Sequence, residues 1–228
     1  MTLQKKTISS AKLEATARSI ADESGVRVTP VAANLNVQSE RERLITACPD
    51  ADILVNNNAG PPPGNFFDMD HAKWLEALEA NLLAPAMMIR GLLPGMQERG
   101  FGRIVNITSA MVKTPVGLMA LSTTARTGLT ALCKSISKGA VRHNVTINNL
   151  LPERIDTPRQ EQMAQIAMKI GGISYEEARQ QQVDSIAAGR LGLPGEFADA
   201  CAFLCSFQAG YISGQNLQLD GGSYDGLI

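Results

Sequence analysis

The chain has 228 residues, with 21 basic and 22 acidic side chains and a formal net charge of −1 at pH 7. This length is sufficient for one large α/β domain, and we expect a single domain over residues 1–228. Balanced charge without a long run of either sign is untypical of proteins that bind nucleic acids or anionic membranes, so we expect a small-molecule ligand. The first residues lack a signal-peptide pattern and no apolar run could span a bilayer, which predicts a cytoplasmic protein.

The cysteines and histidines do not form a metal-binding pattern. The four cysteines contain no C-x-x-C motif, and the two histidines, His71 and His143, lie far apart in the sequence. Cys201 and Cys205 are four residues apart, which is typical of two small apolar residues on the core face of a helix. We therefore expect neither a metal site nor a disulfide.

Helical patterns alternate with short apolar strand candidates along the chain. The first helix is expected over residues 10–24, where Leu13 and Ala17 share an apolar face and Gly25 closes the end. The same periodicity predicts helices over 38–47, 70–99, 122–142, 159–169, 174–188 and 195–207, and strands over 26–33, 52–57, 103–108, 145–151 and 216–220. This alternation predicts an α/β fold with a doubly wound parallel sheet.

In such a sheet, ligands bind beyond the carboxyl ends of the strands. The segments that follow the expected strands are therefore of interest: Asn34, residues 56–64, residues 108–109, residues 152–157 and residues 220–222. We expect all five segments to lie at one rim of the sheet.

The segment NNNAG, residues 56–60, follows a buried-type strand and precedes three prolines. Small residues allow the backbone to approach a ligand closely, and carboxamides can satisfy the donors and acceptors of a turn. A rigid turn without any ligand is the alternative interpretation.

Asn81 lies on an otherwise apolar helix face, with Trp74, Leu78 and Leu82. A buried amide needs hydrogen-bond partners. Pro85 has no N–H to donate to the carbonyl of Asn81, so we expect a kink there. A freed carbonyl and a carboxamide at one buried point would suit an ordered water, whereas the alternative is an ordinary polar residue near a kink.

Two serines and an arginine complete the candidate site. Ser109 ends a strand, where a hydroxyl can donate to a carbonyl or alkoxide oxygen. Ser122 begins a helix, and Arg126 lies one turn later on the same face. The alternatives are a turn-forming Ser109, and for the other two residues a helix N-cap region followed by an exposed arginine.

Six segments, together with Asn81, resemble the short-chain dehydrogenase/reductase family from about residue 10 to the C-terminus, with 3-oxoacyl-[acyl-carrier-protein] reductases the most similar members. They are DILVNNNAG, GRIVNITS, NVTINNLLP, IDT, GRLGLPGEFADACAFLCS and YISGQNLQLDGG, in this order. The resemblance implies a single Rossmann-like domain, a nicotinamide cofactor (NAD or NADP) and hydride transfer between a carbonyl and an alcohol.

The resemblance also implies catalytic residues. The family uses Asn, Ser, Tyr and Lys. Asn81 matches the asparagine that holds a water, and Ser109 matches the serine that orients the substrate oxygen. Ser122 stands where the family has tyrosine, and Arg126 stands where it has lysine.

The cofactor-binding residues implied by the resemblance lie at the same rim. Asn34 is expected beside the adenine, where the family usually has aspartate, and Glu153 replaces the glycine of a Pro-Gly pair. The remaining positions line the cofactor or touch the nicotinamide carboxamide: Asn57, Asn58, Ala59, Gly60, Pro152, Ile155 and Thr157.

The replacement of tyrosine and lysine changes the expected chemistry. A phenol has a pKa near ~10 that a nearby cation lowers, whereas an aliphatic hydroxyl is a much poorer acid. Ser122 would therefore relay a proton through water rather than ionise, while Arg126 would keep a positive charge and grip a ribose. None of the three tyrosines has a lysine four residues later, and Lys113 is a candidate surrogate cation.

The glycine-rich turn that holds the cofactor pyrophosphate in this family has no counterpart here, because the first glycine is Gly25. The first expected helix corresponds to the family's second, so the resemblance implies an N-terminally abbreviated sheet that lacks a leading strand and helix of roughly 30 residues. Residues 1–8 could supply one replacement strand. We expect weak pyrophosphate affinity, and the usual residue that selects between NAD and NADP cannot be identified.

These observations support an oxidoreductase acting on a carbonyl or hydroxy compound, with a 3-oxoacyl thioester as a candidate substrate. A binding or assembly protein that keeps the fold without the chemistry is the alternative, and a hydrolase using Ser109 is a third, disfavoured by the lack of a histidine base. Residues 159–188 resemble the family's substrate lid, or form a solvated helical hairpin. By resemblance, the helices over 70–99 and 122–142 predict a homodimer or homotetramer.

Overall fold

The computed structural model describes residues 10–227, and the chain divides into two compact units, residues 1–49 and residues 50–228. The replacement strand suggested for residues 1–8 lies outside the described part. The expectation of one domain over residues 1–228 stays a prediction.

The first unit contains two helices, α1 (Ser10–Ser24) and α2 (Gln38–Ala47), with the bounds expected from the sequence. The strand expected over 26–33 is wrong, because this segment has no strand geometry. An isolated strand is not stable without a neighbour to pair with, and Pro30 has no N–H to donate. The segment is instead held by side chains of α2, where Arg43 donates to the carbonyl of Ala32.

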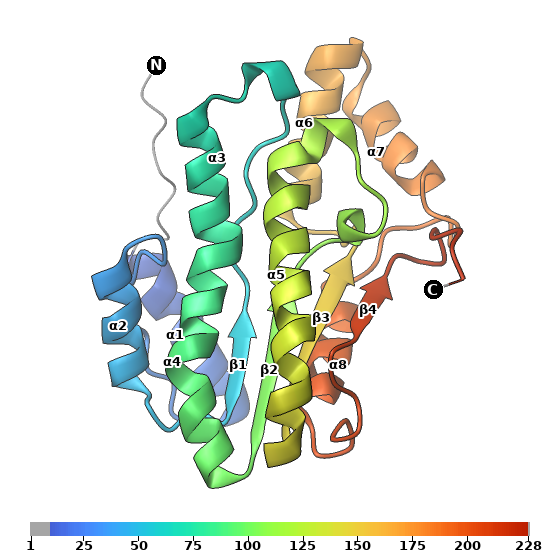
Figure 1. Cartoon of the computed structure of the whole chain (residues 1–228). Coiled ribbons are helices and arrows are strands. Elements are labelled where there is room, and N and C mark those ends of the chain that lie inside the picture. Colours follow the sequence, from blue (N-terminus) through green and yellow to red (C-terminus); the bar gives the residue numbers. More distant parts are fainter. Residues whose placement is uncertain (1–9, 228) are drawn as a thin grey trace. The chain divides into compact units, whose positions relative to one another are not determined.

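The second unit contains a four-stranded parallel sheet in the order β1-β2-β3-β4 (Figure 1). The strands are β1 (Ile53–Asn56), β2 (Gly102–Ile107), β3 (Val145–Pro152) and β4 (Asn216–Leu219). All four correspond to expected strands. β2 and β3 are buried along nearly their whole length, as expected of parallel strands covered on both faces.

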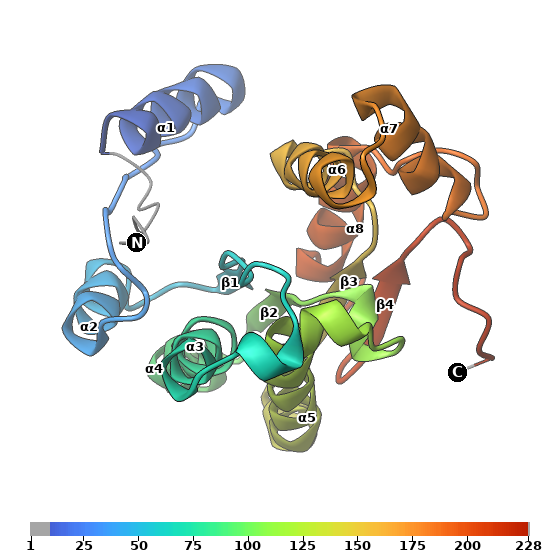
Figure 2. The ribbon, with the colours of Figure 1, turned by 90° about the horizontal axis from the view of Figure 1, so that it is seen from above.

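Helices cover both faces of this sheet. Figure 2 shows α4 and α5 on one side and α8 on the other, so the predicted α/β parallel-sheet architecture is confirmed. The helices are α3 (His71–Leu78), α4 (Ala84–Arg99), α5 (Ala120–Ala140), α6 (Pro158–Gly171), α7 (Tyr175–Asp184) and α8 (Pro194–Cys205). Among residues 10–227, no helix is both long and apolar enough to cross a membrane.

Four asparagines connect the strands through their side chains. Asn56, Asn106, Asn149 and Asn216 occupy paired positions on β1, β2, β3 and β4. Their amides form three successive hydrogen bonds, of 2.9, 3.2 and 2.8 Å. A buried amide is tolerated only when it is hydrogen-bonded, so this ladder specifies the register of all four strands. The register brings the carboxyl ends of β1, β2 and β3 to one rim.

Candidate functional site

Two asparagines tie the loop after β1 to the continuous helix formed by α3, the turn Glu79–Leu83 and α4. The Nδ2 of Asn58 donates to the carbonyl of Ala80 (2.9 Å), and the Nδ2 of Asn81 donates to the carbonyl of Ala59 (3.3 Å). Asn81 is only 4% exposed, so its amide has the partner that burial requires. The two hydrogen bonds fix the loop against the helix.

The helix around Asn81 contains a single π-helical turn, Glu79–Leu83, between α3 and α4. The N–H of Ala84 donates to the carbonyl of Glu79, five residues earlier. Pro85 cannot donate to the carbonyl of Asn81, as the sequence predicted, and the chain accommodates this by widening one turn. The carbonyl and the carboxamide of Asn81 therefore lie at an irregular, buried point of the helix.

Ser122 and Arg126 are neighbours in the first turns of α5. The Nε of Arg126 donates to the hydroxyl oxygen of Ser122 at 3.2 Å. Both residues are buried, with 5% and 9% of their surface exposed, so the interpretation of Arg126 as an exposed arginine is wrong. The N-cap position belongs to Met119, because α5 begins at Ala120. Ser122 is therefore not a capping residue.

The guanidinium of Arg126 connects the ends of two strands. Its Nη1 donates to the carbonyls of Ile107 (2.6 Å) and Thr108 (2.8 Å) at the end of β2. Its Nη2 lies 3.4 Å from the carbonyl of Asn58 in the loop after β1. Nη1 is thus engaged with two backbone carbonyls and Nη2 with one, and the expectation that Arg126 grips a ribose stays a prediction. Arg126 holds the rim together.

Burial lowers the pKa of Arg126, with a smaller contribution in the same direction from the nearby positive charge of Arg159, to about 10 in total. Near neutral pH the guanidinium therefore still carries its charge. None of the carboxylates in the described part of the chain forms an ion pair with Arg126.

Ser109 follows directly after Thr108. It precedes a short 3-10 turn, Ala110–Val112, and its hydroxyl oxygen accepts a hydrogen bond from the N–H of Met111 at 3.2 Å. The side chain is half-buried. Because the hydroxyl oxygen accepts this bond, its proton points elsewhere and suits donation to a ligand oxygen.

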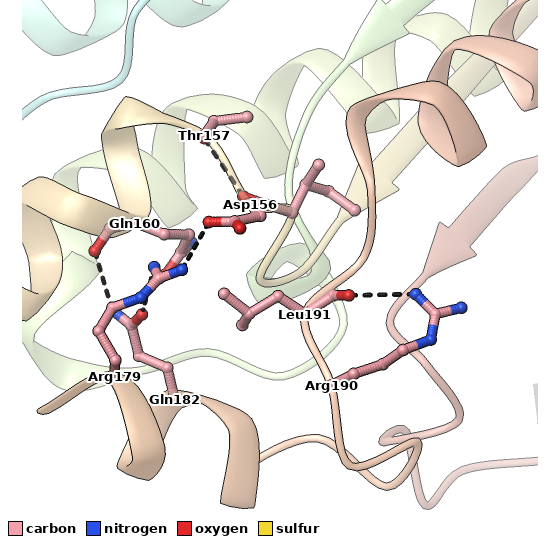
Figure 3. A network of polar contacts seen from close by, with 8 residues as sticks. Asp156, Thr157, Gln160, Arg179, Gln182, Arg190 and Leu191 are labelled. Carbon is pink, nitrogen blue, oxygen red and sulfur yellow. Dashed lines mark hydrogen bonds and ion pairs between the residues drawn. The ribbon is translucent and has the colours of Figure 1, made fainter. Parts of the chain in front are cut away.

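The loop after β3 is held by α7 and by the segment that precedes α8. Pro152 is the last residue of β3, and Ile155 pairs with Gly192 in an isolated parallel bridge. The hydroxyl of Thr157 donates to the carbonyl of Ile155 at 3.2 Å. Figure 3 shows that Asp156 forms an ion pair with Arg179 of α7 at 2.6 Å. Further bonds of the same network join Gln182 to Arg179 and to the carbonyl of Gln160 (Figure 3). These contacts connect the loop after β3, α6 and α7.

Two contacts near the site were not predicted from the sequence. Arg159, in the first turn of α6, donates from Nη2 to the carbonyl of Pro61 at 3.1 Å. The ammonium of Lys113 lies 5.0 Å from the ring centroid of Tyr224 in the C-terminal segment. The sequence suggests Lys113 only as a surrogate cation. No local motif signals these contacts, because each joins residues nearly a hundred positions apart or more.

The structure therefore brings Asn81, Ser122 and Arg126 together around the loop 58–60, with Ser109 beside them on the end of β2. Pro152 ends the neighbouring strand β3, and Ile155 and Thr157 lie in the loop that follows it. Asn34 belongs to the unit 1–49, where its N–H bonds to Glu40 at 2.6 Å. The expectation that Asn34 lies beside the adenine stays a prediction.

Comparisons with known proteins identify the family to which the chain is similar. The family model described as enoyl-(acyl carrier protein) reductase, of the short-chain dehydrogenase/reductase family, matches residues 3–224. The 3-oxoacyl-[acyl-carrier-protein] reductase FabG of Aquifex aeolicus is 32% identical over 218 residues, covering 93% of this chain and 83% of that protein. NADPH-dependent reductase BacG of Bacillus subtilis is 32% identical over 182 residues, covering 80% and 70%.

A solved structure of a similar protein has the same fold. L-sorbose reductase from Gluconobacter frateurii, complexed with NADPH and L-sorbose, superimposes with a TM-score of 0.90 at 27% identity, covering 96% of this chain and 85% of that one.

Proposed function

Because the chain belongs to the short-chain dehydrogenase/reductase family, we propose that it is an NAD(P)-dependent oxidoreductase that interconverts a carbonyl compound and an alcohol. The observation that carries this proposal is the grouping of Asn81, Ser109, Ser122 and Arg126 at the ends of β1 and β2. The cofactor is NAD or NADP, and the relatives that are NADPH-dependent or carry bound NADPH support NADP.

The residues present fit the nicotinamide half of such a cofactor. A Cβ on Gly60 would lie 3.3 Å from the Nη2 of Arg126, so only a residue without a side chain leaves this side of the loop open. We assign the holding of the cofactor to residues 57–60, Pro152, Ile155 and Thr157. When bound, the cofactor supplies or accepts the hydride.

The chain's own hydroxyls bind and orient the substrate. Ser109 donates a hydrogen bond to the substrate oxygen and stabilises the charge that develops there. Ser122 does not ionise, because an aliphatic hydroxyl is a weak acid. It relays a proton: its hydroxyl gives its proton to a water that protonates the substrate oxygen, and takes another from a water connected to solvent. The nearby charge of Arg126 favours an alkoxide over a neutral oxygen. The irregular turn at Asn81 holds a water that connects this path to solvent.

A direct test is the reduction of a panel of ketones and 3-oxoacyl thioesters, followed by the loss of NADPH or NADH absorbance. The proposal predicts turnover of at least one substrate, with 3-oxoacyl thioesters as the first candidates because of the relatives' activity. Absence of turnover together with absence of cofactor binding would refute it.

A binding or assembly protein is the second candidate, and one observation favours it. The guanidinium of Arg126 donates to Ser122 and to three backbone carbonyls, as expected of a structural clamp. Calorimetry separates the two functions, because a scaffold without chemistry binds neither NAD(H) nor NADP(H) at millimolar concentration.

We also propose that the protein acts as a homodimer or homotetramer through α4 and α5, by analogy with the family. Sedimentation of the purified protein tests this, and a monomer at micromolar concentration would contradict it.

A further inference from the structure

Two arginines from different parts of the chain contact the same four-residue stretch of the loop after β1. Arg126 of α5 approaches the carbonyl of Asn58, and Arg159 of α6 donates to the carbonyl of Pro61 at 3.1 Å. Gly60, between these two contacts, lies directly beside the Nη2 of Arg126. The loop thus brings two guanidinium groups to the carboxyl-end rim.

Neither arginine is neutralised by a carboxylate within residues 10–227. The ion pairs made by other arginines of the second unit involve Arg99, Arg179 and Arg190. Burial lowers the pKa of Arg159 as well as that of Arg126, and Arg126 feels the charge of Arg159. Two partly desolvated positive charges that lie close enough to interact are unfavourable unless an anion lies nearby.

The guanidinium of Arg159 also retains unused donors. It has five N–H groups, of which one on Nη2 donates to Pro61 and one on Nη1 donates to Gln162 at 3.0 Å. The Nε–H and one N–H on each terminal nitrogen remain for a ligand. A planar fork of this kind matches the two oxygens of a carboxylate or a phosphate.

We propose that Arg159 is an anion-binding residue, and that its guanidinium, positioned by Pro61 beside the charge of Arg126, binds a phosphate or carboxylate group of the ligand at this rim. The inference rests on the proposed function only in placing a ligand there. It adds a binding role for a residue of the lid helix α6. Two sources supply this anion: the pyrophosphate of the dinucleotide, for which the chain has no glycine-rich turn, or an acidic group on the substrate.

The test measures binding rather than turnover. Isothermal titration calorimetry is carried out with inorganic pyrophosphate, NADPH, acetoacetate and the neutral methyl ester of acetoacetate. The variants are Arg159→Gln, which removes the charge, and Arg159→Lys, which keeps the charge without the fork. Arg142→Gln removes an exposed arginine that has no place in the site and serves as the matched control. Thermal unfolding of each variant verifies the fold.

The expected result is a loss of anion affinity of about tenfold to a hundredfold in Arg159→Gln, the range of one to two charged hydrogen bonds. Arg159→Lys falls between this variant and the wild type, and Arg142→Gln matches the wild type. A loss for pyrophosphate and NADPH assigns the anion to the cofactor. A loss for acetoacetate but not for its ester assigns the anion to the substrate. Unchanged affinity for all four probes in a folded Arg159→Gln variant would overturn the proposal.

Failure of the anion-binding proposal can be distinguished from failure of the proposed oxidoreductase function. If the wild type reduces ketones and Arg159→Gln binds every anion equally well, the inference fails while the oxidoreductase stands. If pyrophosphate or acetoacetate binding depends on Arg159 in a protein that never transfers hydride, the anion site stands while the oxidoreductase fails.

Discussion

The Nε of Arg126 lies 3.2 Å from the hydroxyl oxygen of Ser122, one turn apart on a buried face of α5. By the resemblance to the family, we expect these two residues to stand where related enzymes place a tyrosine and a lysine, and they keep a hydroxyl beside a positive charge. The charge is fixed differently, because the other nitrogens of Arg126 donate to backbone carbonyls at the ends of β1 and β2. The pair therefore combines a structural role with the proposed chemistry.

Replacing Arg126 tests its structural role. Arg126→Gln removes the donors to Ile107 and Thr108, and we expect a loss of about 2 kcal/mol in the free energy of unfolding, the scale of hydrogen bonds to a charged group. Arg126→Lys keeps the charge with fewer donors and loses less. Urea denaturation measures both, with Arg142→Gln expected within about 0.5 kcal/mol of the wild type. Equal stability of all three variants would show that the clamp contributes nothing.

Ser109→Ala tests the proposed orientation of the substrate oxygen. The variant loses the hydroxyl donor, and we expect kcat to fall by about a hundredfold, the usual effect of removing one donor to a developing oxyanion. The Kd for NADPH should remain unchanged, because the hydroxyl is assigned to the substrate. Steady-state kinetics and a separate NADPH titration distinguish the two effects. A fall in NADPH affinity with normal kcat would move Ser109 to cofactor binding.

The double variant Ser122→Tyr with Arg126→Lys restores the phenol and ammonium of related enzymes. We expect kcat to rise by about tenfold or more, because a phenol is a better general acid than an aliphatic hydroxyl. The pH profile should gain a limb that reports the phenol. Either single variant serves as the control. A folded double variant that binds NADPH but is no faster than the wild type would contradict the assignment of Ser122 to proton transfer.

The buried thiol of Cys133 makes the free energy of unfolding depend on pH. Burial raises the pKa of its thiol from about 9 to about 12, despite an opposing hydrogen bond from Asn106. Between these values the unfolded chain releases a proton that the folded chain keeps. This contribution to stability is complete below pH 9 and is lost as pH rises toward 12, at up to about 1.4 kcal/mol per pH unit.

Denaturation of the wild type, Cys133→Ala and Cys48→Ala between pH 8 and 10.5 (roughly the accessible range) measures this slope. The thiols of Cys201 and Cys205 also have raised pKa values, so the comparison is between slopes. Cys133→Ala should be flatter than the wild type, while the exposed Cys48→Ala keeps the wild-type slope. Parallel slopes for all three proteins would exclude the burial effect.

Much of the fold was predictable because periodicity reflects burial. The buried strand β3 and the long helix α5 were expected within two or three residues of their observed bounds. The segment 26–33 shows the limit of this reasoning: its β-branched residues favour extended backbone, but a strand also requires a partner, which a local pattern does not specify. The π-helical turn at Asn81 was anticipated only as a kink, since Pro85 reveals a missing donor and not how the chain adapts.

The candidate site was predictable only in part. Asn81, Ser109, Ser122 and Arg126 were proposed from the resemblance to a family pattern, and their catalytic roles stay predictions. The engagement of Arg126 with three carbonyls depends on how loops from β1 and β2 meet, and Arg159 joins the site across nearly a hundred residues. Contacts of this kind arise from tertiary structure and leave no local signal.

We propose that the residues at this rim hold a nicotinamide cofactor and a carbonyl substrate so that hydride passes between the two. The most direct measurement uses NADPH deuterated at the transferable position of the nicotinamide, with ketones and 3-oxoacyl thioesters as acceptors, and mass spectrometry of the alcohol formed. The account predicts deuterium on the carbinol carbon with the wild type and much less product with Ser109→Ala. A wild-type protein that binds no nicotinamide nucleotide and yields no labelled alcohol would contradict it.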